Sequence, residues 1–269
     1  MKKKEHKILI SKSNGFIGKN LCKILSSNKI TFKEFSFKKK YSKKFLSQFT
    51  HFIHLQFFIS GDKDKNTIYK NYNNIKKVIS ICIHNNLNLI FTSTCSYKYR
   101  KKKKISNKIA VINNYTKSKR MCEELIQKKI KSNTNYVILR LFNVYGSNFN
   151  LRGVIPELVK KLKRNKFIEV LHSENSRDFI HVNDVCKLIV KCLRLKKSYI
   201  FDVGYGKSIK IKKLAMIMKK KFNYKGKLAM SKIKRSKINN FSLANISYVK
   251  KITKWKPLIN LNYGLSDFE

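Results

Sequence analysis

The first half of the chain alternates short apolar runs with longer segments in which apolar residues recur every three to four positions. The short runs cover residues 7–10, 30–35, 52–55, 87–92 and 136–141. Runs of this length predict buried strands, and the longer segments predict amphipathic helices. The clearest helical pattern lies in residues 68–86. Strands that alternate with such helices predict a parallel, doubly wound α/β sheet.

The pattern loosens after about residue 146. Shorter elements are expected at 154–162, 167–170, 185–195 and 209–222. The length allows one large domain or two small ones, and no flexible linker marks a boundary between them.

The composition is that of a globular protein. The 269 residues are 42% hydrophobic and 12% aromatic, which suffices for a buried core. No apolar run approaches the ~20 residues of a membrane-spanning helix, and the first residues lack the ~7-residue apolar stretch of a signal peptide. The six cysteines form no Cys-x-x-Cys pair, and the histidines lack metal-ligand spacing. We expect a cytoplasmic protein without disulfides, bound metal or a membrane anchor.

The formal net charge is +48, from 62 lysine and arginine residues against 14 aspartate and glutamate residues. Such a charge is typical of proteins that bind nucleic acid. Lysine, asparagine and isoleucine are all frequent, however, while arginine, proline, glycine and alanine are scarce, a bias typical of an A+T-rich genome. The lysines are also spread over the whole chain, so we favour compositional drift over a selected nucleic-acid surface. Non-specific binding to polyanions and attraction of anionic substrates are still expected.

Two glycines lie between the first strand and the first helix, in Gly15-Phe16-Ile17-Gly18. At such a turn, backbone N–H groups and the helix dipole can bind a pyrophosphate. Gly15 would let the backbone approach the phosphates, and Gly18 would let helix and strand pack closely. The alternative is an ordinary turn. Because a strand precedes and a helix follows, we favour a nucleotide cofactor site.

Tyr115 and Lys119 are four residues apart in the helix expected at 115–130, so their side chains share one face. A nearby ammonium would lower the pKa of Tyr115, which suits a general acid/base acting on an alcohol. Spacing alone carries little weight, because three other pairs match it. These pairs are Tyr72/Lys76, Tyr97/Lys101 and Tyr99/Lys103. What distinguishes Tyr115 is its position, after the strand that ends at Thr94 and before the strand that leads to Asn143.

Taken in order along the chain, these motifs resemble the extended short-chain dehydrogenase/reductase family, specifically its nucleotide-sugar epimerases, dehydratases and reductases. Further matching segments are residues 92–94, 140–146, 154–156, 177–184, 202–204 and 255–257. The resemblance covers nearly the full length. It implies a Rossmann-type NAD(P)-binding domain over 1–145 and a smaller C-terminal α/β domain over 146–269, interleaved with the first, that binds a nucleoside-diphosphate sugar.

The cofactor site implied by the resemblance lies at the first turn and along the ends of the strands. Its candidate residues are Lys12, Gly15, Phe16, Ile17, Gly18, Glu34, Leu55, Tyr115 and Lys119. Lys12 replaces the first glycine of the family's Gly-x-x-Gly-x-x-Gly. Because lysine does not easily adopt a positive φ, we expect the turn to differ locally, with the ammonium within reach of a phosphate. Glu34 is the candidate for the adenosine ribose and favours NAD over NADP, although Ser36 and Lys38 suit a 2′-phosphate.

The resemblance also implies roles in catalysis and substrate binding. Tyr115 would exchange a proton with a sugar hydroxyl, Thr94 would hydrogen-bond the same oxygen, and Lys119 would bind the nicotinamide ribose. The substrate-binding candidates are Thr94, Asn143, Val154 and Arg177. An arginine suits a diphosphate because its planar fork bonds two oxygens at once.

We therefore expect an NAD(P)-dependent nucleotide-sugar epimerase or keto-sugar reductase, with hydride transfer at a sugar carbon, C4 being favoured. One alternative is a dehydratase, which Cys95-Ser96 disfavours because the dehydratases carry Asp-Glu there. The other is a non-catalytic descendant that binds cofactor or RNA. It is motivated by Lys12, by the charge, by Lys98-Tyr99 in place of the family's usual Tyr-Gly, and by Gln56-Phe57 in place of the usual Ala-Ala. The bulkier Gln56-Phe57 is expected to narrow the nicotinamide pocket. The amphipathic helices at 68–86 and 115–130 predict a homodimer.

Overall fold

The computed structural model describes most of the chain. The described residues are 6–59, 65–96, 113–131, 133–147, 153–164, 167–231 and 241–269. The tyrosine–lysine pairs that begin at Tyr97 and Tyr99 lie outside them.

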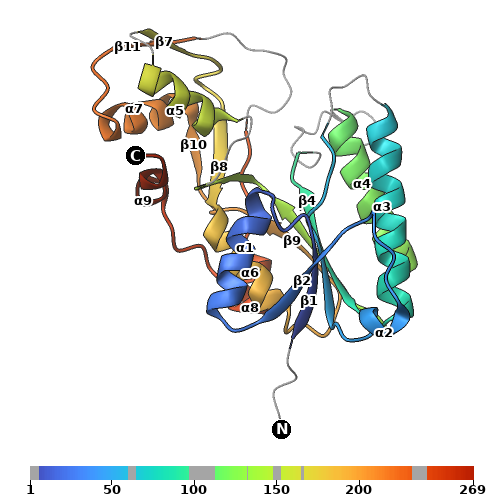
Figure 1. The fold of residues 1–269 in the computed structure, drawn as a ribbon. Helices are drawn as coiled ribbons and strands as arrows, with labels where there is room; N and C mark the ends of the chain where they lie inside the picture. The colour runs from blue at the N-terminus through green and yellow to red at the C-terminus, as the bar shows by residue number, and fades with distance from the viewer. Residues whose placement is uncertain are drawn as a thin grey trace.

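A parallel sheet forms the centre of the molecule (Figure 1). Within the described residues it has six strands, in the order β2-β1-β3-β4-β5-β9. Their bounds are β1 Lys7–Ser11, β2 Thr31–Phe35, β3 His51–His54, β4 Asn88–Thr94, β5 Tyr136–Leu141 and β9 Tyr199–Val203. All neighbouring pairs run parallel. The α/β fold with a parallel central sheet is therefore confirmed.

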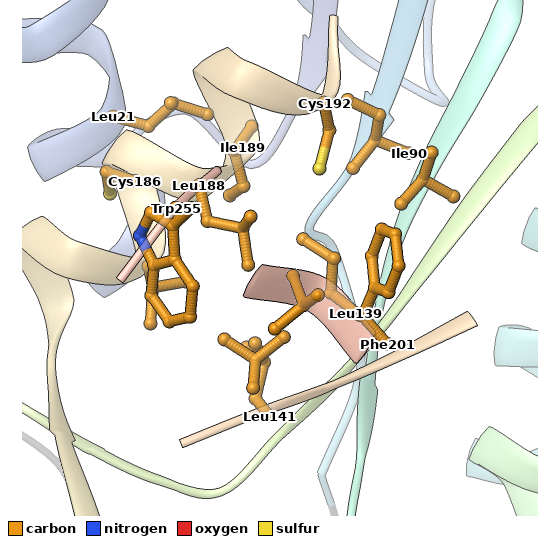
Figure 2. Packing of buried hydrophobic residues seen from close by; sticks show 14 of the residues in the cluster. Leu21, Ile90, Leu139, Leu141, Cys186, Leu188, Ile189, Cys192, Phe201 and Trp255 are labelled. Atoms are coloured by element: carbon orange, nitrogen blue, oxygen red, sulfur yellow. The ribbon is translucent and has the colours of Figure 1, made fainter. Parts of the chain in front are cut away.

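Helices cover both faces of this sheet, which makes it doubly wound (Figure 1). One face carries α1 (Phe16–Ser27), α6 (Val182–Cys192) and α8 (Ser247–Thr253), and the other carries α2 (Lys43–Leu46), α3 (Lys65–His84) and α4 (Asn114–Lys129). Alternate residues of a strand serve the two faces: Ile8 and Ile10 belong to the core under α1, and Leu9 to the core under α3. Figure 2 shows part of the first core, where Trp255 lies near side chains from the sheet and from α6. Because both faces are buried, the strands are continuous apolar runs in the sequence.

The second half of the chain builds a smaller α/β region. Its elements are β6 (Asn143–Tyr145), α5 (Val154–Arg164), β7 (Phe167–Val170), β8 (Ser176–His181), β10 (Ser208–Lys210), α7 (Ile211–Lys221), β11 (Lys227–Met230), α9 (Leu261–Gly264) and a 3₁₀ turn at Leu265–Phe268. Strands β10, β8 and β6 form one small sheet, and β11 pairs with β7. The return of β9 to the main sheet and the packing of α6 on α1 link this half to the first. The boundary at residue 145 stays a prediction.

The structure also shows the state of the cysteines and the character of the helices. All six cysteines are free thiols, and five of them are buried. Among the described residues, no helix combines the length and the apolar character needed to cross a membrane.

Candidate functional site

The candidate site lies at the edge of the sheet where β1, β3 and β4 end. In a parallel sheet the carboxyl ends of all strands meet at one edge, and ligands bind where the strand order reverses. Here the order reverses at β1, which has β2 on one side and β3 on the other. Ser11, His54 and Thr94 are the last residues of β1, β3 and β4. These three residues therefore lie at the same end of the sheet, next to the point where the strand order reverses.

The turn after β1 has the geometry of a phosphate-binding turn. The N–H of Gly15 donates to the Lys12 carbonyl (3.1 Å), and α1 begins at Phe16. A Cβ on Gly18 would lie within 3.0 Å of the carbonyl oxygens of Lys12 and Ser13, so only glycine lets the helix approach the turn this closely. The first turn of α1 has no acidic residue and no side-chain cap. This leaves the positive end of the helix dipole available to an anion, as the diphosphate of NAD(P) requires.

Lys12 corrects one expectation. The turn was expected to differ locally, yet Lys12 adopts φ 63°, a conformation that a glycine in its place would take readily. The left-handed region costs a lysine about 1 to 2 kcal/mol, which the surrounding contacts offset. Its side chain runs toward the helix: Cγ lies 3.1 Å from the place that a Cβ on Gly15 would occupy. The residue is exposed, so the ammonium is accessible at the start of α1.

The other cofactor candidates occupy different parts of this edge. Phe16 and Ile17 are partly buried in the first turn of α1. Leu55 follows β3, and its N–H donates to Ser11 Oγ (3.1 Å). Glu34 is exposed near the end of β2, opposite Ile10 in the register. The role of Glu34 as the ribose ligand stays a prediction.

The start of α4 places Tyr115 beside the end of β4. Asn113 Oδ1 accepts from the Thr116 N–H (2.9 Å), and Thr116 Oγ1 accepts from the Asn113 N–H (3.1 Å). This reciprocal capping box makes Asn114 the first helical residue. Tyr115 therefore lies in the first turn of α4, where its hydroxyl shares a hydrogen bond with the Thr94 side chain. Thr94 is buried and also bonds Ser96 Oγ (2.9 Å).

The acidity of Tyr115 differs from the expectation. Burial and, to a smaller extent, the nearby Cys95 raise the pKa of Tyr115 to about 12, against the opposing effect of the hydrogen bond from Thr94. Lys119 is not among these causes, so the expected lowering by its ammonium is wrong for this arrangement. The physical reason is the direction of the lysine side chain. Its Nζ lies 5.9 Å from the centroid of the Tyr115 ring and donates to the Thr92 carbonyl.

Lys119 is enclosed by aromatic rings. Only 3% of the residue is exposed, and its Nζ lies 3.7 Å from the centroid of the Phe57 ring and 4.7 Å from that of Phe91. Burial lowers the pKa of Lys119 to about 7, against the opposing effects of Cys122 and Glu123. At neutral pH its charge is therefore easily changed by its surroundings.

The substrate-binding candidates come from the second half of the chain. Arg177 lies on β8, is partly buried, and donates from Nη1 to the Ser176 carbonyl (2.9 Å). Burial lowers the pKa of Arg177 and the neighbouring Cys95 opposes this, so the guanidinium lies near the residue that follows Thr94. Asn143 Nδ2 donates to the Asp178 carbonyl (2.8 Å).

Val154 lies apart from this group. It is the first residue of α5, partly buried against the core of the smaller region. The structure thus brings together Thr94, Tyr115, Lys119 and, through Cys95, Arg177. It places Val154 and Glu34 in other elements, α5 and β2, and their roles stay predictions.

Sequence reasoning missed Asp178 as an organising residue. This fully buried carboxylate accepts hydrogen bonds from the N–H groups of Tyr205, Gly206 and Ala244 (2.7, 2.9 and 3.0 Å). It thereby ties β8, next to Arg177, to the segments after β9 and before α8. The signal was present, because the two-residue period of a strand puts Asp178 on the same side as the buried Ile180.

Comparison with known proteins agrees with this architecture. A family model described as the NAD dependent epimerase/dehydratase family matches residues 8–204. CDP-abequose synthase from Salmonella muenchen is 33% identical over 119 residues, which are 42% of this chain and 41% of that protein. Less than half of that relative's length is thus matched.

Two solved structures match over nearly their whole length. UDP-glucose 4-epimerase from Thermotoga maritima, with UDP-glucose, has a TM-score of 0.82 at 18% identity, covering 97% of both chains. RMD from Pseudomonas aeruginosa, complexed with NADPH, has a TM-score of 0.83 at 19% identity, covering 98% of this chain and 99% of that one. At these identities the likeness shows the fold alone.

Proposed function

The chain belongs to the NAD-dependent epimerase/dehydratase family, and from that premise we propose that it is an NAD(P)-dependent nucleotide-sugar epimerase or keto-sugar reductase. The resemblance expected from the sequence is thereby confirmed, together with an NAD-dependent enzyme class. The finer reaction is our proposal: proton transfer by Tyr115 at a sugar hydroxyl, with C4 as the favoured carbon.

The observation that carries this proposal is the bond between Thr94 and Tyr115 at the carboxyl end of β4. A tyrosine hydroxyl already bonded to a second hydroxyl can pass its proton to or from an alcohol bound between them. Arg177, one of the few arginines of this lysine-rich chain, lies near Cys95 beside this pair and suits a substrate diphosphate.

Each residue has a defined task in this reaction. Tyr115 takes a proton from the sugar hydroxyl during oxidation and returns it during reduction. Thr94 holds the same oxygen, and Arg177 fixes the diphosphate so that the sugar lies over the end of β4. Lys12 and the first turn of α1 would hold the cofactor diphosphate, and Lys119 would hold the nicotinamide ribose. The bound NAD(P) supplies the hydride acceptor and donor.

A variant of Tyr115 tests the proposal. The purified protein is incubated with nucleoside-diphosphate sugars and NAD(H) or NADP(H), and turnover is followed by chromatography of the sugars. Tyr115→Phe should lower kcat about 10²- to 10⁴-fold, the usual contribution of a general acid/base, and should leave cofactor binding intact.

Tyr72→Phe is the matched control. Tyr72 has the same spacing to Lys76, whose Nζ lies 5.5 Å from its ring, but it lies within α3. This variant should keep full activity. An unimpaired Tyr115→Phe enzyme would rule out the proposed acid/base.

The cofactor requirement separates the two reactions. An epimerase returns the hydride to its own substrate and needs no added reductant. A keto-sugar reductase consumes one NAD(P)H for each product. A dehydratase is less favoured, because Cys95 and Ser96 stand where dehydratases carry Asp-Glu, and burial raises the pKa of the Cys95 thiol to about 12.

A non-catalytic descendant is the second candidate. It is favoured by the contact of Lys119 with Phe57 and by the raised pKa of Tyr115. Cofactor binding without turnover of any sugar, or salt-sensitive binding of RNA, would support it. The homodimer and the cytoplasmic location stay predictions.

A further inference from the structure

Phe57 covers the lysine of the candidate catalytic pair. Its ring centroid lies 3.7 Å from Lys119 Nζ, and the ring meets that of Tyr115 edge to face at 5.6 Å. A cation at this distance from a ring face is held by the quadrupole of the ring. Together with the Thr92 carbonyl and the Phe91 ring, Phe57 encloses the ammonium. The Phe57 ring thus covers one side of the Lys119 ammonium, the group that is expected to bind the cofactor ribose.

The backbone on both sides of Phe57 is fixed by hydrogen bonds. Before it, the N–H groups of Leu55 and Gln56 both donate to Ser11 Oγ (3.1 Å each). After it, the buried Asn71 accepts from the Phe58 N–H (2.9 Å) and donates to the Phe58 carbonyl (3.0 Å). The ring can therefore leave Lys119 by rotating about its own side-chain bonds, without rearrangement of the strand end.

Within the part of the chain that the structure describes, few charged groups compete with this contact. Among the described residues, the titratable groups that act on Lys119, or on which it acts, are Tyr115, Cys122 and Glu123 from α4 and His54 from β3. Glu123 is engaged by Arg140 on β5, whose Nη2 lies 2.7 Å from Oε2. His54 is held by Ser11 Oγ through Nδ1 (2.8 Å), and burial lowers its pKa to about 3, which keeps it neutral.

We propose that Phe57 is a positioning residue, which holds Lys119 against the Thr92 carbonyl and withholds its ammonium from the cofactor ribose until the ring turns aside. The proposal rests on the proposed function, because it takes Lys119 as the ribose ligand. Binding of NAD(P) then breaks the contact between ring and cation, which weakens the cofactor affinity. Released from the ring, the ammonium can also approach Tyr115 and favour its phenolate.

The test compares cofactor binding by the native chain and by Phe57→Ala, using quenching of protein fluorescence by NADH and NADPH. Removal of the ring should tighten binding about 2- to 30-fold, the range that one cation–π contact covers. The acid limb of the pH profile of kcat should also move to lower pH, since a solvated Lys119 stays charged and lowers the pKa of Tyr115. A ring that merely completes the packing would give weaker binding on removal and no such movement.

Two further variants make the result decisive. Phe45→Ala removes another partly buried ring from the same apolar core and controls for lost stability; its cofactor affinity should match the native chain. Phe57→Leu keeps apolar volume without the ring face and should also bind more tightly than the native chain. If both Phe57 variants bind the cofactor no more tightly than the native chain does, the proposed role of Phe57 is overturned and the proposed function is unaffected. Absence of binding by every protein would contradict the proposed function as well.

Discussion

Replacing Lys12 by glycine should stabilise the fold and weaken cofactor binding at once. Lys12 holds φ 63°, a conformation that costs a residue with a Cβ about 1 to 2 kcal/mol. Glycine removes that cost but adds freedom to the unfolded chain, so a net gain of about 1 kcal/mol is expected. The side chain is exposed, so little packing is lost. A gain of this size raises the Tm of a chain this long by about 2 to 4 °C.

The effect on the cofactor should have the opposite sign. The exposed ammonium of Lys12 lies near the positive end of α1, where a diphosphate would accept a charge-assisted bond. An exposed pair of charges contributes about 0.5 to 1 kcal/mol, so the Kd for NAD(H) should rise about two- to fivefold in Lys12→Gly. High salt should reduce this difference between native chain and variant.

Two other lysines provide matched controls. Lys29 and Lys254 also adopt left-handed backbone, with φ 55° and 52°, and both lie outside the candidate site. Lys29→Gly and Lys254→Gly should gain similar stability in urea unfolding and leave the Kd unchanged. The reasoning is refuted if the two controls gain stability and Lys12→Gly does not. A Kd unchanged in Lys12→Gly would remove Lys12 from the cofactor site.

Two further predictions concern buried titratable groups. Burial lowers the pKa of both His54 and His51 to about 3, whereas in the unfolded chain these groups titrate near 6.5. The unfolded state therefore binds more protons below that pH, and stability should fall from pH 6.5 toward pH 3. The unfolding free energy is measured in urea at several pH values between 3 and 6.5. In His54→Asn, unfolding should take up about one proton fewer, so the unfolding free energy should change with pH by about 1.4 kcal/mol per pH unit less than in the native chain. Asp178→Asn should cost about 3 kcal/mol of unfolding free energy, because an amide NH₂ would face backbone N–H donors. Glu157→Gln, at an exposed position, is the control and should change the unfolding free energy by less than about 0.5 kcal/mol. Equal losses of unfolding free energy in the two variants would contradict the role of Asp178.

The candidate site shows why some residues could be found from the sequence. Gly15 and Gly18 lie between a strand and a helix, and this local order suffices to predict a phosphate-binding turn. Tyr115 and Lys119 share a helix, so their spacing alone places them on one face. What spacing could not supply is the direction of the Lys119 ammonium, because that depends on Phe57 from another strand end.

The strand β9, which the sequence did not predict, has a similar explanation. β9 was not expected, although Tyr199–Val203 contains alternate buried residues. It is short and follows a basic segment, and its partner β5 lies far away in the sequence. A strand of this kind is defined by the neighbour it pairs with, and only the folded sheet identifies that neighbour.

The sequence by itself determined the order of strands and helices in the first half, the doubly wound class, the first turn and the tyrosine–lysine pair. These features depend on periodicity and on residues close together in the chain. Only the tertiary structure decided the conformation of Lys12, the hydrogen bonds of Asp178, and the direction of Lys119. The physical reason is that burial and long-range contacts, rather than local preference, set the energies of Asp178 and Lys119, whereas the exposed Lys12 is held by the close approach of α1 to its carbonyl. The raised pKa of Tyr115 and the lowered pKa of Lys119 are results of that burial.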